Sequence, residues 1–194
     1  MINSPNILVL DNYDSFTYNL VHYVEDILNK KITVYRNDQI SLKEVNQFDS
    51  IILSPGPGLP ADAGIMPALI KQYATVKKIL GICLGHQAIV ESFGGSLYNL
   101  PKVYHGVSSP VRVDNTQVIF KNLEQRLVVG RYHSWAVQST DLPSCFSVIA
   151  SDEEGVIMGV KHKQLDVTGI QFHPESILTP NGYQMIQNWL TEKN

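Results

Sequence analysis

The segment around Cys83 has the residue types and spacing of a nucleophile held at a sharp turn. Residues 81–87 read Gly-Ile-Cys-Leu-Gly-His-Gln and continue the apolar run that begins at Ile79. Glycines on both sides of the cysteine leave room for a tight strand-to-helix turn, which lifts the side chain out at the strand's end. The helix expected next directs its positive end at the sulfur and favours the reactive thiolate. A lone cysteine in a strand is ordinarily a buried structural residue, but the glycines and the helix start favour a nucleophile.

A candidate base for this thiol follows a second apolar strand near the end of the sequence. The predicted strand covers residues 167–172, and His173, Pro174 and Glu175 come directly after it. This spacing lets the Glu175 carboxylate accept a hydrogen bond from one ring nitrogen of His173 while the other nitrogen faces the sulfur. The three side chains would then form the nucleophile, base and orienting group of a catalytic triad.

A loop of alternating proline and glycine, residues 54–60, follows a predicted strand at residues 51–53. Such a loop is stiff and still lets backbone amides approach a ligand closely. The N–H of Gly58 is therefore a candidate oxyanion donor, and the N–H of Leu84, directly after the nucleophile, is the second. Taken alone, the loop is equally well explained as an ordinary strand-to-helix connection. It has neither the Lys-Ser/Thr ending nor the Gly-x-Gly-x-x-Gly pattern of a phosphate-binding loop.

The order of the predicted elements indicates an open α/β sheet, mostly parallel and flanked by helices. Strands and helices alternate in the first part of the chain, and this alternation gives right-handed crossovers between parallel strands. The predicted strands are residues 7–10, 32–35, 51–53, 79–82 and 167–172, and the predicted helices are 15–28, 41–48, 66–73, the segment after Cys83, and 181–192. Ligands bind outside the carboxyl ends of such strands, where Cys83, Gly58 and His173 would converge.

The sequence also predicts two helix caps and a small antiparallel addition to the sheet. Asp14 or Ser15 is expected to cap the first helix, and Ser41 with Glu44 forms a capping box for the second. A small antiparallel addition is predicted from short runs separated by turn residues. Its strands are residues 107–113, 118–120, 128–132, 147–150 and 156–160.

Composition limits the class of protein. The 194 residues are 44% hydrophobic and 17% charged, which predicts a single globular domain over residues 1–194. A net charge of −3 without a basic run argues against nucleic acid as a partner. We expect no membrane association, since no apolar run is long enough to span a bilayer, and no signal peptide at residues 1–5. Cys83 and Cys145 make no disulfide framework, which fits the reducing cytoplasm, and no metal-ligand spacing is present.

Together, these segments resemble the signature blocks of class I glutamine amidotransferases, in the same order and over nearly the whole chain, from Ile7 to Trp189. The blocks are residues 11–20, 54–60, 81–87, 133–135 and 169–176. The Asp-Asn-Tyr-Asp-Ser-Phe start and the Ser-Pro-Gly-Pro-Gly loop look most like those of the glutaminase subunits of anthranilate synthase and aminodeoxychorismate synthase. One departure is Val107, at a position where many relatives carry lysine.

The resemblance implies a glutaminase that hydrolyses L-glutamine and passes ammonia to a chorismate-using large subunit. Cys83 would attack the side-chain amide, His173 would move the protons, and Glu175 would orient His173. No cofactor is implied in this chain, and Mg²⁺ is expected only in the partner subunit. The substrate contacts implied by the resemblance come from Gly56, Pro57, Gly58, Gln87, Ser134 and Trp135.

Several alternatives stay open. Anthranilate synthesis in the tryptophan branch is the first assignment, and the folate branch, or service to both, is the second. Outside this function, a non-catalytic flavodoxin-like binding module and a cysteine hydrolase or protease of similar topology remain. An exposed apolar patch for the large subunit is expected near the site, with candidates Tyr13, Tyr98, Val103 and Tyr104.

Overall fold

A mixed sheet in the order β2-β1-β3-β4-β11-β10-β9-β6-β7 forms the centre of the computed structural model, which describes residues 5–191. One half is parallel and contains β2 (Thr33–Arg36), β1 (Ile7–Asp11), β3 (Ser50–Leu53), β4 (Lys78–Ile82) and β11 (Val167–Ile170). The other half is antiparallel and contains β10 (Ile157–His162), β9 (Phe146–Asp152), β6 (Val107–Val113) and β7 (Arg126–Arg131). A separate two-stranded sheet pairs β5 (Leu97–Asn99) with β8 (Trp135–Val137).

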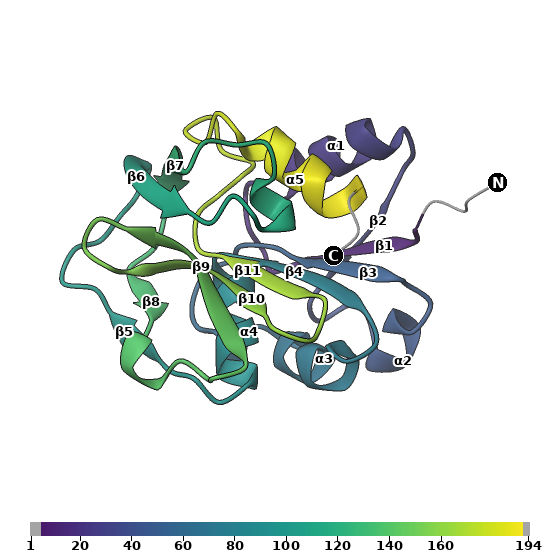
Figure 1. The fold of residues 1–194 in the computed structure, drawn as a ribbon. Coiled ribbons are helices and arrows are strands. Elements are labelled where there is room, and N and C mark those ends of the chain that lie inside the picture. The colour runs from purple at the N-terminus through teal and green to yellow at the C-terminus, as the bar shows by residue number, and fades with distance from the viewer. Residues whose placement is uncertain (1–4, 192–194) are drawn as a thin grey trace.

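Helices cover both faces of the parallel half (Figure 1). Helices α1 (Thr17–Leu28) and α5 (Gly182–Thr191) lie on one face, and α2 (Leu42–Val45), α3 (Met66–Tyr73) and α4 (Leu84–Ser92) lie on the other. Three short 3₁₀ turns complete the elements: η1 (Pro60–Asp62), η2 (Val118–Phe120) and η3 (Ser139–Asp141).

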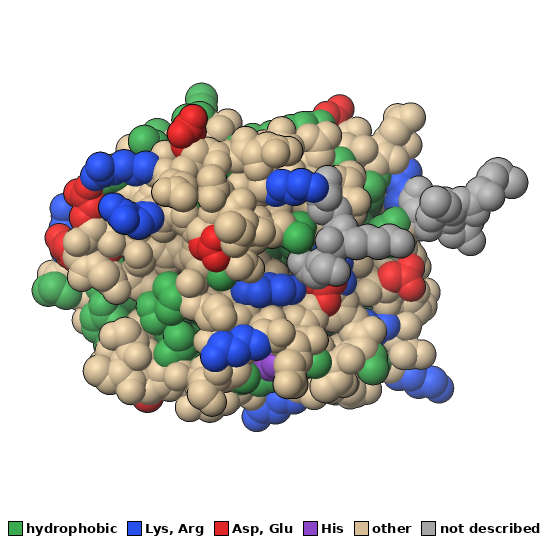
Figure 2. Space-filling view, in the orientation of Figure 1, with side chains coloured by type: hydrophobic (Ala, Val, Ile, Leu, Met, Phe, Trp, Pro, Cys, Tyr) green, Lys and Arg blue, Asp and Glu red, His purple; other side chains and the backbone are tan. Residues whose placement is uncertain are grey.

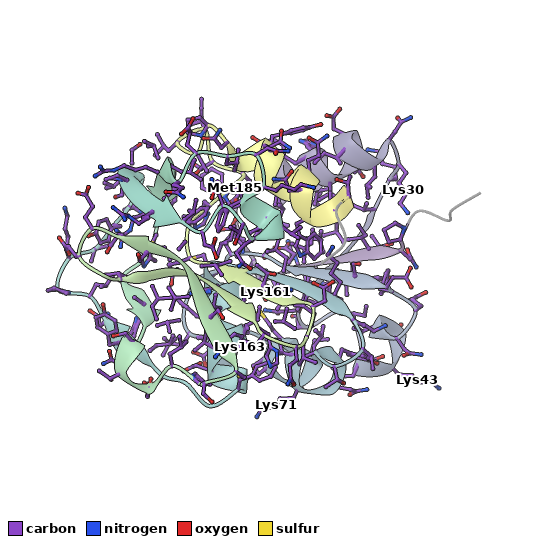
Figure 3. The ribbon with its side chains drawn as sticks, viewed as in Figure 1. Lys30, Lys43, Lys71, Lys161, Lys163 and Met185 are labelled. Atoms are coloured by element: carbon purple, nitrogen blue, oxygen red, sulfur yellow. The ribbon has the colours of Figure 1, made fainter. Side chains whose placement is uncertain are left out.

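The strands of the parallel half are apolar throughout because both of their faces are buried. In β1, Ile7 and Val9 pack into the core cluster shared with α1 and α5, while Leu8 and Leu10 pack into the cluster shared with α3 and α4. Met185 of α5 lies in the first of these layers, between its helix and the sheet (Figure 3).

The predicted fold class is confirmed, including the parallel sheet and its helices. The antiparallel addition is more extensive than expected, because its four strands continue the same sheet beyond β11. Strand β4 lies between β3 and β11, so the loops after these strands meet at one edge. The candidate site is built at that edge.

One predicted strand was wrong, and two short strands were missed. Residues 118–120 form η2 and not a strand, because Ile119 and Phe120 are buried and Asn188 of α5 donates to the carbonyls of Ile119 and Lys121. Strands β5 and β8 were not predicted, since each has only three residues.

Of the two predicted helix caps, one is confirmed and one is wrong. The capping box of Ser41 and Glu44 is present at α2. Helix α1 begins later than expected, with Phe16 at the N-cap and no side-chain cap. The Asp14 carboxylate instead accepts a hydrogen bond from the Phe16 N–H at 2.8 Å.

Charged side chains of both signs are mixed over the face shown in Figure 2, without a continuous basic area. Between residues 5 and 191, no helix has the length and apolar character needed to span a bilayer. In the same range, no three His, Cys, Asp or Glu side chains are grouped as a metal site. The signal-peptide prediction concerns mainly residues 1–4, and the predicted end of the last helix, Glu192, also lies outside the described residues.

Candidate active site

Cys83 occupies a strained turn between β4 and α4. Its backbone has φ +50° and ψ −101°, a conformation that is costly for a residue with a side chain. The flanking glycines make the turn possible: a Cβ on Gly81 would lie 2.5 Å from the Gly85 carbonyl group, and a Cβ on Gly85 would lie 2.6 Å from the Leu53 oxygen. Helix α4 therefore starts directly at the cysteine, whose side chain is buried but retains 6% exposure.

His173 and Glu175 lie after β11, the strand beside β4. His173 Nδ1 and Glu175 Oε1 are 2.6 Å apart, and both side chains are buried. The His173 backbone is fixed as well, because its N–H donates to the Gly130 carbonyl at 3.1 Å and its carbonyl accepts from Thr179 Oγ1 at 2.6 Å. The other ring nitrogen, Nε2, has no hydrogen-bond partner among residues 5–191.

The pKa of His173 is held above its usual range. Burial lowers this pKa, but the Cys83 sulfur and the Glu175 carboxylate together raise it by more than burial lowers it. At neutral pH the ring is therefore an imidazolium. The protonated ring lies beside the Cys83 sulfur, so the pair is arranged for nucleophilic attack followed by proton donation.

The loop at residues 54–60 packs directly against the turn at Cys83. Gly56 must be glycine, because a Cβ there would lie 2.5 Å from the Asn12 oxygen and 3.0 Å from Leu84 Cδ2. Asn12 holds the loop through its N–H to Ser54 Oγ and its Nδ2 to the Ser54 carbonyl, both at 2.8 Å.

The two candidate oxyanion donors lie on this loop and on the helix. Gly58 is exposed beside Pro57 and has φ +77°, which glycine adopts without strain. Leu84 is the first residue of α4, so its N–H has no acceptor within the helix. Both amides thus belong to segments in contact with the nucleophile's turn.

Gln87 and Trp135, two of the expected substrate contacts, are linked to Cys83 by a chain of hydrogen bonds. Gln87 Nε2 donates to the Trp135 carbonyl at 2.9 Å and to Gln171 Oε1 at 3.1 Å. Gln171 Nε2 then lies 3.5 Å from Cys83 Sγ. Ser134 and Trp135 are half-buried, and the Ser134 carbonyl accepts from the Leu100 N–H at 2.7 Å.

A family model described as glutamine amidotransferase class-I matches residues 8–193. The chain belongs to this family. It is 45% identical over 186 residues to aminodeoxychorismate synthase component 2 of Escherichia coli strain K12, covering 95% of this chain and 98% of the relative. It is 43% identical over 194 residues to anthranilate synthase component 2 of Pseudomonas aeruginosa, covering 96% of each. A crystal structure of a glutamine amidotransferase from Thermotoga maritima shares the fold, with a TM-score of 0.79 at 14% identity and 97% of each chain covered.

Two residues of this amidotransferase site were missed in the sequence. Gln171 is fully buried next to Cys83, and the signal was a glutamine inside an otherwise apolar strand. Asp14 interacts electrostatically with His173 and Glu175, and burial raises its pKa. Asp14 stands in the first signature block, where the sequence predicts only a helix cap for it.

Of the four residues expected to be exposed around the amidotransferase site, two are exposed and two are not. Tyr13 and Val103 are 48% and 67% exposed, as expected of a docking surface. Tyr98 is half-buried, and the prediction for Tyr104 was wrong. Tyr104 is buried because its ring stacks on His133 at 5.7 Å between centroids.

Proposed function

We propose that this chain is the glutaminase subunit of a chorismate-using synthase and that Cys83, His173 and Glu175 carry its chemistry. The single observation behind this proposal is the strained turn at Cys83, next to an imidazole that Glu175 holds at 2.6 Å. Relatives named as component 2 of aminodeoxychorismate synthase and of anthranilate synthase give the reaction and the partner.

In the first half-reaction, the Cys83 thiolate attacks the side-chain amide carbon of L-glutamine. The N–H groups of Gly58 and Leu84 donate to the oxyanion of the tetrahedral intermediate. The His173 imidazolium gives its proton to the departing nitrogen, so ammonia leaves and a glutamyl thioester remains on Cys83.

In the second half-reaction, His173 is neutral and acts as the base. It takes a proton from water as the water oxygen attacks the thioester carbon. The carbon–sulfur bond breaks, glutamate leaves, and the thiolate and imidazolium are restored. Glu175 stabilises the imidazolium in both steps and keeps its Nδ1 proton in place.

Substrate binding is assigned to the groups around this turn. Gln87 and the backbone of Ser134 and Trp135 would hold the α-amino and α-carboxylate groups of glutamine. Gly56, Pro57 and Gly58 would line the opposite side, where the loop approaches the turn closely. No metal or other cofactor is needed for these steps, and Mg²⁺ is expected only in the large subunit.

An apolar surface beside the site is the proposed docking area for the large subunit. Tyr13 and Phe16 follow β1, Leu59 follows β3, and Ile177 follows β11, so their strands end at the edge that carries Cys83. Val103 directly precedes Tyr104, whose ring stacks on His133. These five residues are 48%, 39%, 36%, 94% and 67% exposed in the order Tyr13, Phe16, Leu59, Ile177 and Val103. Exposed apolar residues gathered at the edge of the sheet that carries the site favour a protein interface there.

We assign the anthranilate branch first and keep the folate branch as the alternative, because relatives of similar identity carry both names. The acceptor chemistry belongs to the large subunit, so the identity of that subunit decides the branch. The free thiols of Cys83 and Cys145 are consistent with the reducing cytoplasm.

The test is product formation by the complex with the large subunit from the same organism, using glutamine or added ammonia as the nitrogen source. Cys83→Ser should abolish glutamine-dependent synthesis and leave ammonia-dependent synthesis intact, because the partner's site is untouched. Cys145→Ser, a half-buried cysteine away from the turn, is the matched control and should leave both unchanged. Near wild-type use of glutamine by Cys83→Ser would refute the assignment.

A further inference from the structure

A buried ion pair adjoins the site and takes no part in the mechanism above. Arg131 Nη1 in β7 and Asp152 Oδ2 at the end of β9 are 2.7 Å apart, and the two side chains are 2% and 5% exposed. The guanidinium also lies over the ring of Tyr104, with Cζ 3.6 Å from the centroid. Its Nη2 is buried without a hydrogen-bond partner among residues 5–191. Burying two charges and leaving one donor unpaired is a poor way to stabilise a fold, so the pair points to another role.

The remaining donor of this guanidinium determines the state of His133. Arg131 Nε lies 3.2 Å from His133 Nε2, and a guanidinium nitrogen can only donate. His133 Nε2 must therefore accept, which places the ring proton on Nδ1. Nδ1 lies 2.8 Å from the Trp135 carbonyl oxygen, so this N–H donates to that carbonyl. Arg131 thereby selects the one neutral tautomer of His133 that can hold Trp135.

The ring is neutral under working conditions. Burial lowers the pKa of His133 to about 4, against the opposing effect of its bond to the Trp135 carbonyl, and the charge of Arg131 lowers it further. Tautomer, and not charge, is therefore the property that Arg131 controls at neutral pH.

The Trp135 carbonyl is where this chain of contacts meets the substrate site. It accepts from His133 Nδ1 at 2.8 Å and from Gln87 Nε2 at 2.9 Å. Gln87 also donates to Gln171, which approaches Cys83 Sγ at 3.5 Å. In the opposite tautomer, a ring lone pair would face the carbonyl lone pairs, and the carbonyl would be pushed away from Gln87.

We propose that Arg131 is a positioning residue for the glutamine site, acting through the tautomer of His133 on the Trp135 carbonyl and Gln87. The proposal rests on the proposed function, in which those two groups hold the α-substituents of glutamine. In this arrangement the Asp152 carboxylate holds the guanidinium in place. The proposal also explains why an arginine, which cannot change its protonation state, is buried at this point.

The test combines nuclear magnetic resonance of the ring nitrogens with glutamine kinetics. Arg131→Lys keeps a positive charge beside Asp152 but has no N–H at the position of Nε. The ¹⁵N shifts of His133 should report the Nδ1–H tautomer in the wild-type chain and a larger share of Nε2–H in Arg131→Lys. In the complex with the large subunit, KM for glutamine should rise on the order of tenfold, equivalent to about 1.4 kcal/mol. The value of kcat should stay within about twofold, since the change acts on substrate binding.

Two further variants separate positioning from general loss of structure. Arg126→Lys is the matched control, because Arg126 lies on the same strand and pairs with Glu153 at the surface, and it should change neither readout. His133→Asn puts an amide donor near the position of Nδ1 and has no tautomer to select. Adding Arg131→Lys to His133→Asn should therefore raise KM no further.

An Nε2–H tautomer in the wild-type chain, or the same tautomer in Arg131→Lys as in wild type, would overturn the proposal. Full additivity of the two substitutions in KM would also overturn it. The proposed function fails separately, if the wild-type complex does not hydrolyse glutamine. The ring-nitrogen shifts then still decide whether Arg131 selects the tautomer.

Discussion

The hydrogen bond between His173 and Glu175 makes a quantitative prediction for Glu175→Gln. The carboxylate is fully buried and accepts from Nδ1 at 2.6 Å, so the variant replaces a charged acceptor by a neutral one of the same shape. A hydrogen bond to a charged group contributes about 1.5–3 kcal/mol and a neutral one about 1 kcal/mol, a difference of roughly 0.5–2 kcal/mol. That difference corresponds to a fall of about one unit in the pKa of His173.

The direction of the pH effect follows from the role of the imidazolium. Cys83 and Glu175 hold the pKa of His173 above its usual value against the effect of burial, and the protonated ring donates to the departing nitrogen. Activity is therefore lost as pH rises through this pKa. Replacing the carboxylate should move the alkaline limb of the glutaminase profile to lower pH by about one unit. Because the ring stays protonated at neutral pH, the loss of rate there should be smaller than the loss caused by His173→Ala.

The assay is glutamate release by the complex with the large subunit, measured across pH for wild type and Glu175→Gln. Glu91→Gln, an exposed glutamate on α4, is the matched control and should leave the profile unchanged. Thermal unfolding of both variants shows whether the fold is intact. A well-folded Glu175→Gln variant with wild-type rate and an unmoved alkaline limb would refute the reasoning.

Further substitutions test the base, the turn and the docking surface. His173→Ala should lower the glutaminase rate by roughly 10²–10⁴-fold, the usual contribution of general acid–base catalysis; a loss no larger than that of the orienting carboxylate would contradict its assignment as the base. Gly85→Ala places a Cβ 2.6 Å from the Leu53 oxygen and should lower the free energy of unfolding by about 1–3 kcal/mol, measured by denaturant titration; unchanged stability would show that the turn does not need glycine there. Ile177→Asp should weaken binding to the large subunit in a titration without slowing alkylation of the active-site thiol, whereas Val76→Asp, which lies before β4 at the opposite end of the strand, should bind normally; equal binding by both variants would remove this surface from the interface.

The sequence was informative where local chemistry and local structure require the same residues. The glycines around Cys83 predicted both the strained turn and the start of α4, and the spacing from His173 to Glu175 predicted their hydrogen bond. The alternation of apolar strands and amphipathic helices predicted the parallel half of the sheet, because burial on both faces leaves a continuous apolar run.

The remaining features depend on contacts between distant segments, which local patterns do not specify. The apolar run at residues 118–120 fits a strand as well as a buried 3₁₀ turn, and only the packing of α5 decides between them. Tyr104 is buried by His133 and Arg131, which come almost thirty residues later, so its burial had no signal in its own neighbourhood. The pairing of Arg131 with Asp152 likewise joins two strands that are separate in sequence.

The central claim is that Cys83 forms a covalent intermediate with glutamine, and rapid-quench mass spectrometry tests it most directly. The complex is mixed with glutamine, quenched in acid within a turnover, digested and mapped by peptide. The mechanism predicts a glutamyl group as a thioester on the peptide that contains Cys83 and none on the peptide that contains Cys145. Steady glutamine hydrolysis without this adduct, or with the glutamyl group on another residue, would contradict it.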